Sequence, residues 1–411
     1  MQNRFYYILG GVVVLLCIIG IVWFFFFRST ASISTNSTGS SGFNVNIPSA
    51  TNTTPAPTDT NGSQTINTTT SAQQKIFQIS QDPVVGATLM QTLRPTTTIA
   101  RFIRQDDGHV YDVPLGVSGV VPKVVSNITI PGGQRAIWLE GGNAAIMQYV
   151  DDSMTVKTVY MGFPHATTTN TATLPTRITF LPDNLIDIAA SPDGKSVAYL
   201  IKTANGSDGY VAKDDGTASK KLFSLPLVQV LLSWPSQGTL LAESKSAVGV
   251  TGIAFSINAS TGVATELVTA PGLTALADKT FANILYQTAD GNSNNTYLYS
   301  TKNNSSSISP IPALPEKCIW SNLVSSEIFC ADAPGGVSVN YLDLWHRGVD
   351  NEIDYISEIN FANQTGSVIA ALGTKQGGAA ADILEMALSP DEHYLSYTTK
   401  GDRSLWGVLL Q

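Results

Sequence analysis

Two copies of one turn motif constrain most strongly what this chain can fold into. Ser191-Pro192-Asp193-Gly194 and Ser389-Pro390-Asp391-Glu392 each stand between a short apolar run and a segment in which apolar and polar residues alternate. An inner strand, a tight turn and a second strand, in that order, are typical of a blade in a β-propeller. The motif therefore predicts an all-β fold in which blades of short strands surround a central axis.

Weaker copies of the same pattern recur along the chain. The anchor positions of the predicted turns are Gln91, Ile130, Ser191, Ser233, Ala277, Ser321 and Ser389. Most of the intervals between them are close to the ~40–45 residues of common four-stranded blades. The positions predict seven blades, with six or eight as alternatives because the first copy is weakly marked.

The two ends of the predicted ring complement each other. The last copy reaches only a third strand, near residues 404–410, before the sequence stops. Residues 75–79 resemble the segment 220–225, which is the fourth strand of the clearest copy. We expect the N-terminal strand to complete the C-terminal blade, which closes the ring and leaves no exposed sheet edge.

The start of the chain predicts a membrane anchor at residues 1–28. Residues 5–27 contain no charged side chain, and Arg4 and Arg28 bracket them. A helix of this length covers ~34 Å, which is enough to cross a hydrocarbon core of ~30 Å. A cleaved signal peptide is the alternative, but its apolar core is usually only ~7–15 residues long. We expect a single-pass membrane protein that contacts the lipid bilayer through residues 5–27.

Residues 29–74 predict a disordered linker between this anchor and the domain at 75–411. The segment is rich in Ser, Thr and Asn, and Asp59 is its one charged residue. It has too little apolar surface to offset the entropy lost on folding. Linkers of this composition commonly raise a domain above the outer face of a membrane. We therefore expect the propeller on the extracytoplasmic side.

The charge balance and the missing motifs limit the classes of function. The sequence has 31 acidic and 23 basic residues, a net charge of -8, and no basic cluster, so nucleic acid is not an expected partner. No His-Glu-x-x-His, Gly-x-Ser-x-Gly or phosphate-binding Gly-Lys pattern is present. We assign no catalytic residue, metal or cofactor, and the sequence favours binding over catalysis.

The repeats carry a resemblance to known propellers. The turn at 191–194 resembles the repeats of TolB-like and WD-type β-propellers. The order of span, linker and ring resembles uncharacterised membrane-anchored propeller proteins of bacteria. The residues that carry this second resemblance are 77–79, 82–84, 318–321 and 344–346. TolB-like proteins bind envelope partners, so the first resemblance implies a binding role. They are soluble, however, and the predicted membrane anchor of this chain departs from that pattern.

Cys318 and Cys330 are candidates for a disulfide. They are symmetric about Val324, in a stretch that predicts a strand, a turn and a strand. Opposed residues at a non-hydrogen-bonded position of a hairpin approach to ~4.5 Å between α-carbons, near the lower end of disulfide spans. The alternative is two separate buried thiols.

An insertion near the C-terminus supplies the candidate binding residues. These are Trp345, His346, Arg347, Asp350, Glu352 and Asp354. One hypothesis makes Trp345 an exposed anchor and the three acids a polar or cation-binding rim, so that Trp345→Ala abolishes binding at nearly unchanged stability. The alternative is a loop or helix that covers one end of the ring.

Together these patterns predict an extracytoplasmic binding or scaffold module for an envelope protein or a glycan. A propeller hydrolase or lyase with its site in the central funnel is one alternative. A structural surface component is another. The fold does not decide among them, because propellers serve many functions.

Overall fold

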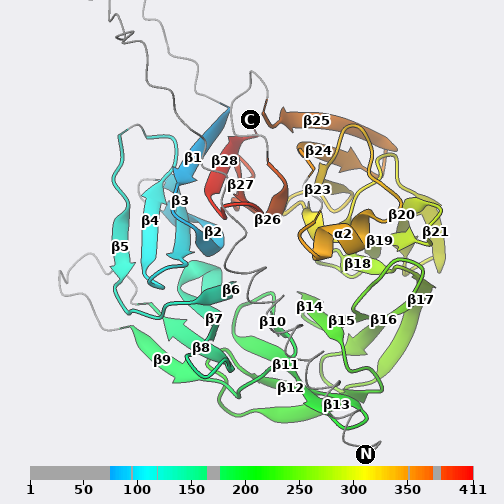
Figure 1. Ribbon diagram of the computed structural model, residues 1–411, viewed down its shortest axis with the longest axis horizontal. Coiled ribbons are helices and arrows are strands. Elements are labelled where there is room, and N and C mark those ends of the chain that lie inside the picture. Colours follow the sequence, from blue (N-terminus) through cyan, green and yellow to red (C-terminus); the bar gives the residue numbers. More distant parts are fainter. Residues whose placement is uncertain are drawn as a thin grey trace, which may run out of the picture. The chain divides into compact units, whose positions relative to one another are not determined.

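The computed structural model describes residues 75–93, 96–117, 119–163, 176–349, 352–373 and 381–410. These residues form seven four-stranded sheets arranged as the blades of a ring (Figure 1). The predicted span at 5–27 and linker at 29–74 lie outside the described residues. Within the described ranges no helix is long and apolar enough to cross a membrane.

The first four blades follow one another along the chain. Blade 1 consists of β2 (Val84–Leu93), β3 (Thr96–Arg104), β4 (Val110–Pro114) and β5 (Lys123–Ser126). Blade 2 consists of β6 (Gly133–Leu139), β7 (Ala144–Val150), β8 (Val156–Gly162) and β9 (Arg177–Phe180). Blade 3 consists of β10 (Ile188–Ala190), β11 (Ser196–Thr203), β12 (Gly206–Lys213) and β13 (Lys220–Leu225). Blade 4 consists of β14 (Val230–Ser236), β15 (Thr239–Ser244), β16 (Thr251–Asn258) and β17 (Ala264–Pro271).

The last three blades complete the ring. Blade 5 consists of β18 (Thr274–Ala277), β19 (Asn283–Ala289), β20 (Asn294–Ser300) and β21 (Ser305–Ile308). Blade 6 consists of β22 (Cys318–Trp320), β23 (Glu327–Asp332), β24 (Tyr355–Asn360) and β25 (Thr365–Ala371). Blade 7 combines β26 (Ile383–Leu388), β27 (Tyr394–Thr399) and β28 (Leu405–Leu409) with β1 (Ile76–Ser80). Among the described residues, three short helices lie between strands: η1 (Glu140–Gly142), η2 (Pro315–Lys317) and α2 (Tyr341–His346).

Ring closure by the N-terminal strand is confirmed. β1 pairs antiparallel with β28, with Ile76 opposite Val408 and Gln78 opposite Trp406. The backbone groups of β28 are therefore bonded on both sides, to β27 and to β1. The prediction of seven blades is confirmed as well.

The core lies between the blades. The second strand of a blade is covered on both faces by neighbouring blades, so it carries a continuous apolar run and not an alternating one. In β11 four successive residues, from Val197 to Leu200, are buried. Leu200 packs with Phe223, Trp234 and Leu240 in one cluster shared by blades 3 and 4.

Hydrogen bonds from its own side chains stabilise the turn motif. Ser191 Oγ donates to Asp193 Oδ1 (2.7 Å), and the Ser196 amide donates to Ser191 Oγ (3.0 Å). Gly194 has a φ of 68°, a conformation that glycine adopts without steric cost. In the second copy Glu392 adopts the same conformation, at a φ of 54°. Its carboxylate accepts a 2.9 Å hydrogen bond from Ser321 Oγ, so this side chain ties the turn of blade 7 to that of blade 6.

Blade 2 differs from the sequence prediction by one strand. The predicted turn near Ile130 lies before β6, which is the innermost strand of the blade, and not after it. The turn that follows β6 is η1, where Glu140 and Gly141 have positive φ values of 48° and 62°. Because η1 lacks the Ser-Pro-Asp residues of the turns at 191–194 and 389–392, the sequence pattern does not mark it.

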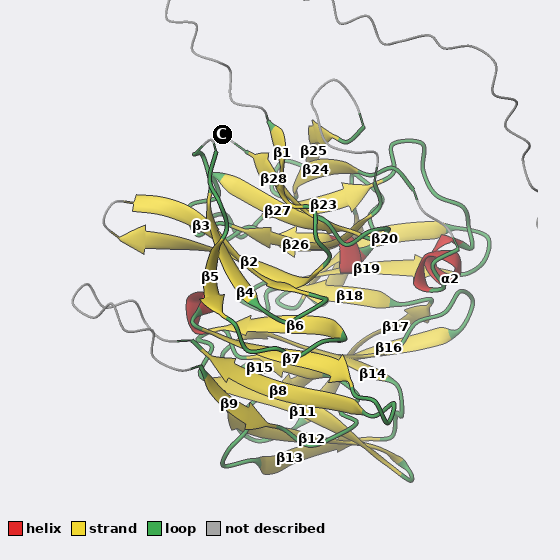
Figure 2. Cartoon of the chain, turned by 60° about the vertical axis from the view of Figure 1, so that its left-hand side comes forward, coloured by secondary structure: helices red, strands yellow, loops and turns green. Residues whose placement is uncertain are grey.

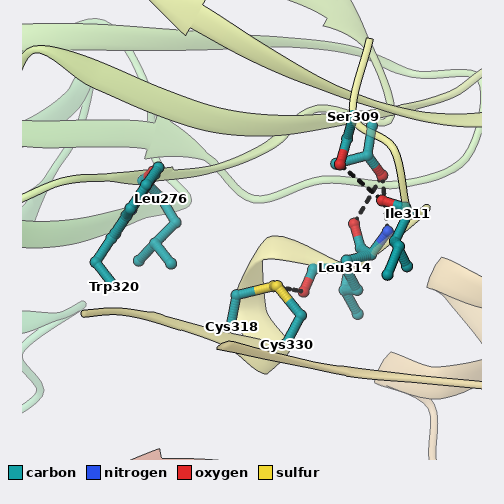
Figure 3. Close-up of a disulfide and its surroundings, with 9 residues drawn as sticks. Leu276, Ser309, Ile311, Leu314, Cys318, Trp320 and Cys330 are labelled. Atoms are coloured by element: carbon teal, nitrogen blue, oxygen red, sulfur yellow. Dashed lines mark hydrogen bonds between the residues drawn. A yellow bond between two sulfur atoms is a disulfide. The ribbon is translucent and has the colours of Figure 1, made fainter. Parts of the chain in front are cut away.

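The structure pairs Cys318 with Cys330 in a disulfide (Figure 3). The two residues are directly opposite in the β22–β23 ladder, and their α-carbons are 4.1 Å apart. Near the disulfide, Trp320 Nε1 donates a 3.2 Å hydrogen bond to the carbonyl of Leu276. Blade 6 is thus cross-linked internally and bonded to the inner strand of blade 5.

Candidate functional site

The candidate site lies under the insertion that joins β23 to β24. Neighbouring strands within a blade are antiparallel, so this connection lies on the same face of the ring as the segments that enter blades 6 and 7. The insertion carries α2, which packs near β18 and β19 in the ring (Figure 1) and is one of the few helical segments in an otherwise β-structured domain (Figure 2). The same face therefore receives residues from several blades.

Hydrogen bonds fasten the insertion to three neighbouring blades. The Val248 amide, after β15 of blade 4, donates to Asp343 Oδ1 at 2.9 Å. Asn294 Nδ2, in blade 5, donates to the carbonyl of Ser338 at 2.7 Å. Trp345 Nε1 donates to Asp382 Oδ1, in the segment that enters blade 7, at 3.0 Å. Because the insertion is held at several points, it forms a fixed cover over this part of the ring.

A buried ionic network lies beneath this cover. Lys317 is 2% exposed, and its Nζ lies 2.6 Å from Asp354 Oδ2 and 2.7 Å from Asp382 Oδ1. Its third hydrogen bond, of 3.1 Å, goes to the hydroxyl of Tyr341. Lys400 Nζ lies 3.2 Å from Asp382 Oδ2, so two ammonium groups balance two carboxylates. Buried charges are tolerated when they are paired in this way.

The shifts in pKa follow from burial and pairing. Burial raises the pKa of Asp354 to about 6, although the Lys317 ammonium acts in the opposite direction. Burial lowers the pKa of Lys317, but the carboxylates of Asp354 and Asp382 outweigh it and hold this pKa above its usual value. Lys317 therefore stays charged at neutral pH.

A cavity of 230 Å³ adjoins this network. Its apolar lining includes Pro312, Ala313, Leu314, Val337 and Val339. Its polar lining consists of Gln287, Asn294, Lys317, Asp332, Tyr341 and Asp354. Blade 5, blade 6 and the insertion all contribute to these walls. The cavity is therefore formed by packing between blades and by the cover.

Three oxygen atoms of the lining residues have no hydrogen-bond partner in the described part of the chain. They are Gln287 Oε1, Asn294 Oδ1 and Asp332 Oδ1, and all three are buried. Gln287 is 4% exposed and lies opposite Thr296 in the β19–β20 ladder. Asn294 is two residues from Thr296, so Gln287 and Asn294 share one face of blade 5. Each unpaired buried acceptor costs about 1–3 kcal/mol, which a hydrogen-bond donor in the cavity would recover.

The structure corrects the hypothesis of an exposed tryptophan. Trp345 is 6% exposed and packs in a cluster with Leu314, Tyr341 and Leu342. It is buried because α2 lies flat on the ring and Asp382 accepts its indole N–H. The insertion instead corresponds to the alternative expectation, a loop or helix that covers one end of the ring.

The other candidate residues separate into different environments. Asp354 is fully buried and lines the cavity, whereas Arg347 is exposed and Glu352 is half-buried. His346 Nε2 lies 2.9 Å from Glu316 Oε1. Asp350 lies outside the described residues. The acids that are described do not form one exposed rim, because the buried Lys317 holds Asp354 inside. Among the described residues no three His, Cys, Asp or Glu side chains are grouped so that they could hold a metal ion.

Three residues at the site were not predicted from the sequence: Gln287, Lys317 and Asp332. Each is a polar residue beside an apolar run: Gln287 follows 284–286, and Asp332 follows 328–331. A polar side chain in a strand that is buried on both faces needs a partner. A polar residue beside an apolar run therefore identifies each position, but it does not show that the three side chains lie close together.

Comparisons with known proteins found similar solved structures but no related family. No known protein family and no curated protein matches the sequence. Among solved structures, oligogalacturonate lyase from Vibrio parahaemolyticus is similar at 6% identity and a TM-score of 0.49, over 82% of this chain and 92% of that one. TolB from Acinetobacter baumannii is similar at 10% identity and a TM-score of 0.42, over 79% of this chain and 78% of that one.

A protein of unknown function from Desulfotomaculum acetoxidans is similar at 13% identity and a TM-score of 0.46, over 74% of this chain and 89% of that one. These likenesses concern the fold and say nothing about activity. The chain has the fold that its repeats predict, a β-propeller of seven blades.

Proposed function

We propose that this protein is a binding module whose ligand enters the cavity between blades 5 and 6. The observation that carries the proposal is the set of unpaired buried oxygens of Gln287, Asn294 and Asp332 in the lining of one cavity. Buried polar groups in native proteins are nearly always paired, so three such oxygens in one place favour a ligand that donates hydrogen bonds.

The cover supports binding by preorganisation. The insertion is bonded to blades 4, 5 and 7, through Asp343, Ser338 and Trp345 respectively. A ligand that enters a cavity with fixed walls loses little free energy to ordering of the protein. Gly336 and Val339 are exposed lining residues, so the cavity reaches solvent on this side.

The proposed setting is the outer face of a membrane. The predicted anchor at 5–27 and linker at 29–74 would hold the propeller there, where an envelope protein or a glycan supplies the ligand. The Cys318–Cys330 disulfide supports this setting, since disulfides persist in oxidising compartments and are rare in the cytosol.

The hydrolase or lyase alternative has weaker support. Asp107, His109 and Thr129 form an acid–histidine–hydroxyl chain, with 3.1 Å from Asp107 Oδ2 to His109 Nδ1 and 3.1 Å from His109 Nε2 to Thr129 Oγ1. Thr129 is exposed, and none of the three residues lines the cavity. A hydroxyl in water without an enclosing site does not favour catalysis. A purely structural role does not explain the unpaired oxygens.

A fragment screen tests the proposal. We would record ligand-observed NMR spectra of small amines, alcohols and sugars with the full chain in detergent micelles. In the variant Ala333→Trp a large side chain occupies the cavity, and in the control Ala362→Trp the same side chain lies on the exposed β24–β25 turn. We expect some fragments to bind the wild type and the control but not Ala333→Trp.

Equal binding to all three proteins would contradict the proposal, as would a screen without any bound fragment. If Ala333→Trp fails to fold, Val339→Trp at the exposed side of the cavity replaces it. The melting curve of each variant shows whether it is folded.

A further inference from the structure

We propose that the group recognised in this cavity is a primary ammonium on a short alkyl chain, as in a lysine side chain. The inference rests on the proposed binding function and specifies its ligand. It follows from the hydrogen-bonding capacity of the lining, its charge and the size of the cavity, each described below.

Three of the lining residues each carry an acceptor oxygen without a hydrogen-bond partner among the described residues. Gln287 Oε1, Asn294 Oδ1 and Asp332 Oδ1 are unpaired acceptors. An ammonium group has three N–H donors and no acceptor, whereas each hydroxyl of a sugar also brings lone pairs that require donors. Lys317 cannot supply those donors, because its three N–H groups already bond to Asp354, Asp382 and Tyr341. The amide N–H of Asn294 is bonded to Ser338.

The charge of the site favours a cation. Lys317 and Lys400 balance Asp354 and Asp382, so the carboxylate of Asp332 is an additional negative charge in the lining. Burial raises the pKa of Asp332, which means that the anion is poorly solvated in the protein alone. A cation beside it would stabilise the ionised form.

The rest of the cavity suits a short hydrocarbon. The apolar part of the lining consists of Pro312, Ala313, Leu314, Val337 and Val339. A volume of 230 Å³ equals that of about seven or eight water molecules at ~30 Å³ each. This is enough for the four methylene groups and the ammonium of a lysine side chain, but not for a large ring system.

The test measures the affinity of n-butylammonium for the full chain in micelles by isothermal titration or chemical-shift titration. n-Butanol has the same chain without the charge, and tetramethylammonium has the charge without N–H donors. We expect n-butylammonium to bind and the other two probes to bind at least ten-fold more weakly. Glucosamine tests the other source of an ammonium group, an amino sugar, and we expect it to bind more weakly because its hydroxyls would lie against the apolar part of the lining.

Two substitutions connect the affinity to the site. Asp332→Asn keeps the shape and removes the charge, and we expect it to weaken n-butylammonium at least ten-fold. The control Asp208→Asn removes a carboxylate of blade 3 that pairs with Lys221, and it should change nothing. Gln287→Leu, which removes one acceptor at similar volume, should weaken the probe by a smaller factor.

The outcomes separate this inference from the proposed function. If n-butylammonium does not bind, or binds Asp332→Asn as well as the wild type, the ammonium inference is wrong. If n-butanol or glucosamine then binds and Ala333→Trp abolishes that binding, the cavity is still a binding site, with a different ligand. If no probe binds in a way that depends on the cavity, both proposals fail.

Discussion

At the scale of single residues, Lys317 holds the groups around the cavity in place, although none of its own N–H donors remains available to a ligand. Its ammonium bonds to the start of α2 at Tyr341, to the end of the insertion at Asp354 and to the segment before β26 at Asp382. All its donors are used, so it acts as a cross-link. Its charge holds Asp354 and Asp382 inside the protein, whereas Asp332 Oδ1 has no partner among the described residues.

The burial of Trp345 changes the expected result of its substitution. Trp345→Ala would leave a cavity under α2 and remove one of the two hydrogen bonds to Asp382 Oδ1, so we expect the free energy of unfolding to fall by about 3–5 kcal/mol. Chemical denaturation of the wild type and the variant measures the difference. Trp345→Phe, which loses the N–H but keeps most of the packing, should cost less. A Trp345→Ala protein of wild-type stability would show that the side chain does not pack as described.

At the scale of elements, the Cys318–Cys330 disulfide between β22 and β23 restrains Lys317, the residue directly before Cys318. Lys317 is the last residue of η2 and is followed directly by Cys318. The cross-link fixes the start of β22 against β23, whose last residue is Asp332. One covalent bond thus restrains both the segment that ends at Lys317 and the strand that ends at Asp332.

Removal of this disulfide is expected to destabilise blade 6 first. The cysteines are 12 residues apart, and closing a loop of that size contributes about 2–3 kcal/mol. The double substitution Cys318→Ser, Cys330→Ser should lower the unfolding free energy by that amount. Hydrogen exchange should show faster exchange in β22 and β23 than in β11, which lies in blade 3. Equal acceleration in both blades would argue against a local effect.

The same elements show what could be predicted from the sequence. Turns such as 191–194 and 389–392 satisfy their hydrogen bonds locally, so their residues mark them. The paired cysteines follow from strand register, which is also local. The site depends on Gln287, Lys317 and Asp332, which come from different blades and meet only through packing of the ring. The turn at η1 was missed because positive φ angles at Glu140 and Gly141 replace the motif.

At the scale of the whole domain, the ring depends on a strand from its N-terminal end. β1 covers the outer edge of blade 7, and Ile76 and Val408 both lie in the cluster that fills this blade. An uncovered β28 would present unpaired backbone groups, which promote association between chains. The stability of all seven blades is therefore linked to a few residues after the predicted linker.

Two truncations test this dependence. Deletion of residues 1–74 retains β1, and we expect a monomer that unfolds in one cooperative transition. Deletion of residues 1–81 removes β1, and we expect an aggregating protein without such a transition. Calorimetry and size-exclusion chromatography compare the two proteins. If the shorter protein is equally cooperative and monomeric, β1 is dispensable for the fold.

The pairing of β1 with β28 also sets an order of events during synthesis. The ribosome releases β1 early and β28 last, and at ~5–20 residues per second the interval between them is roughly 15–65 s. For that time β1 has no partner within its own chain, and the seventh blade does not yet exist. A protein whose synthesis is not yet complete would therefore be an open arc, and its unpaired β1 could bind a chaperone or another copy of the chain.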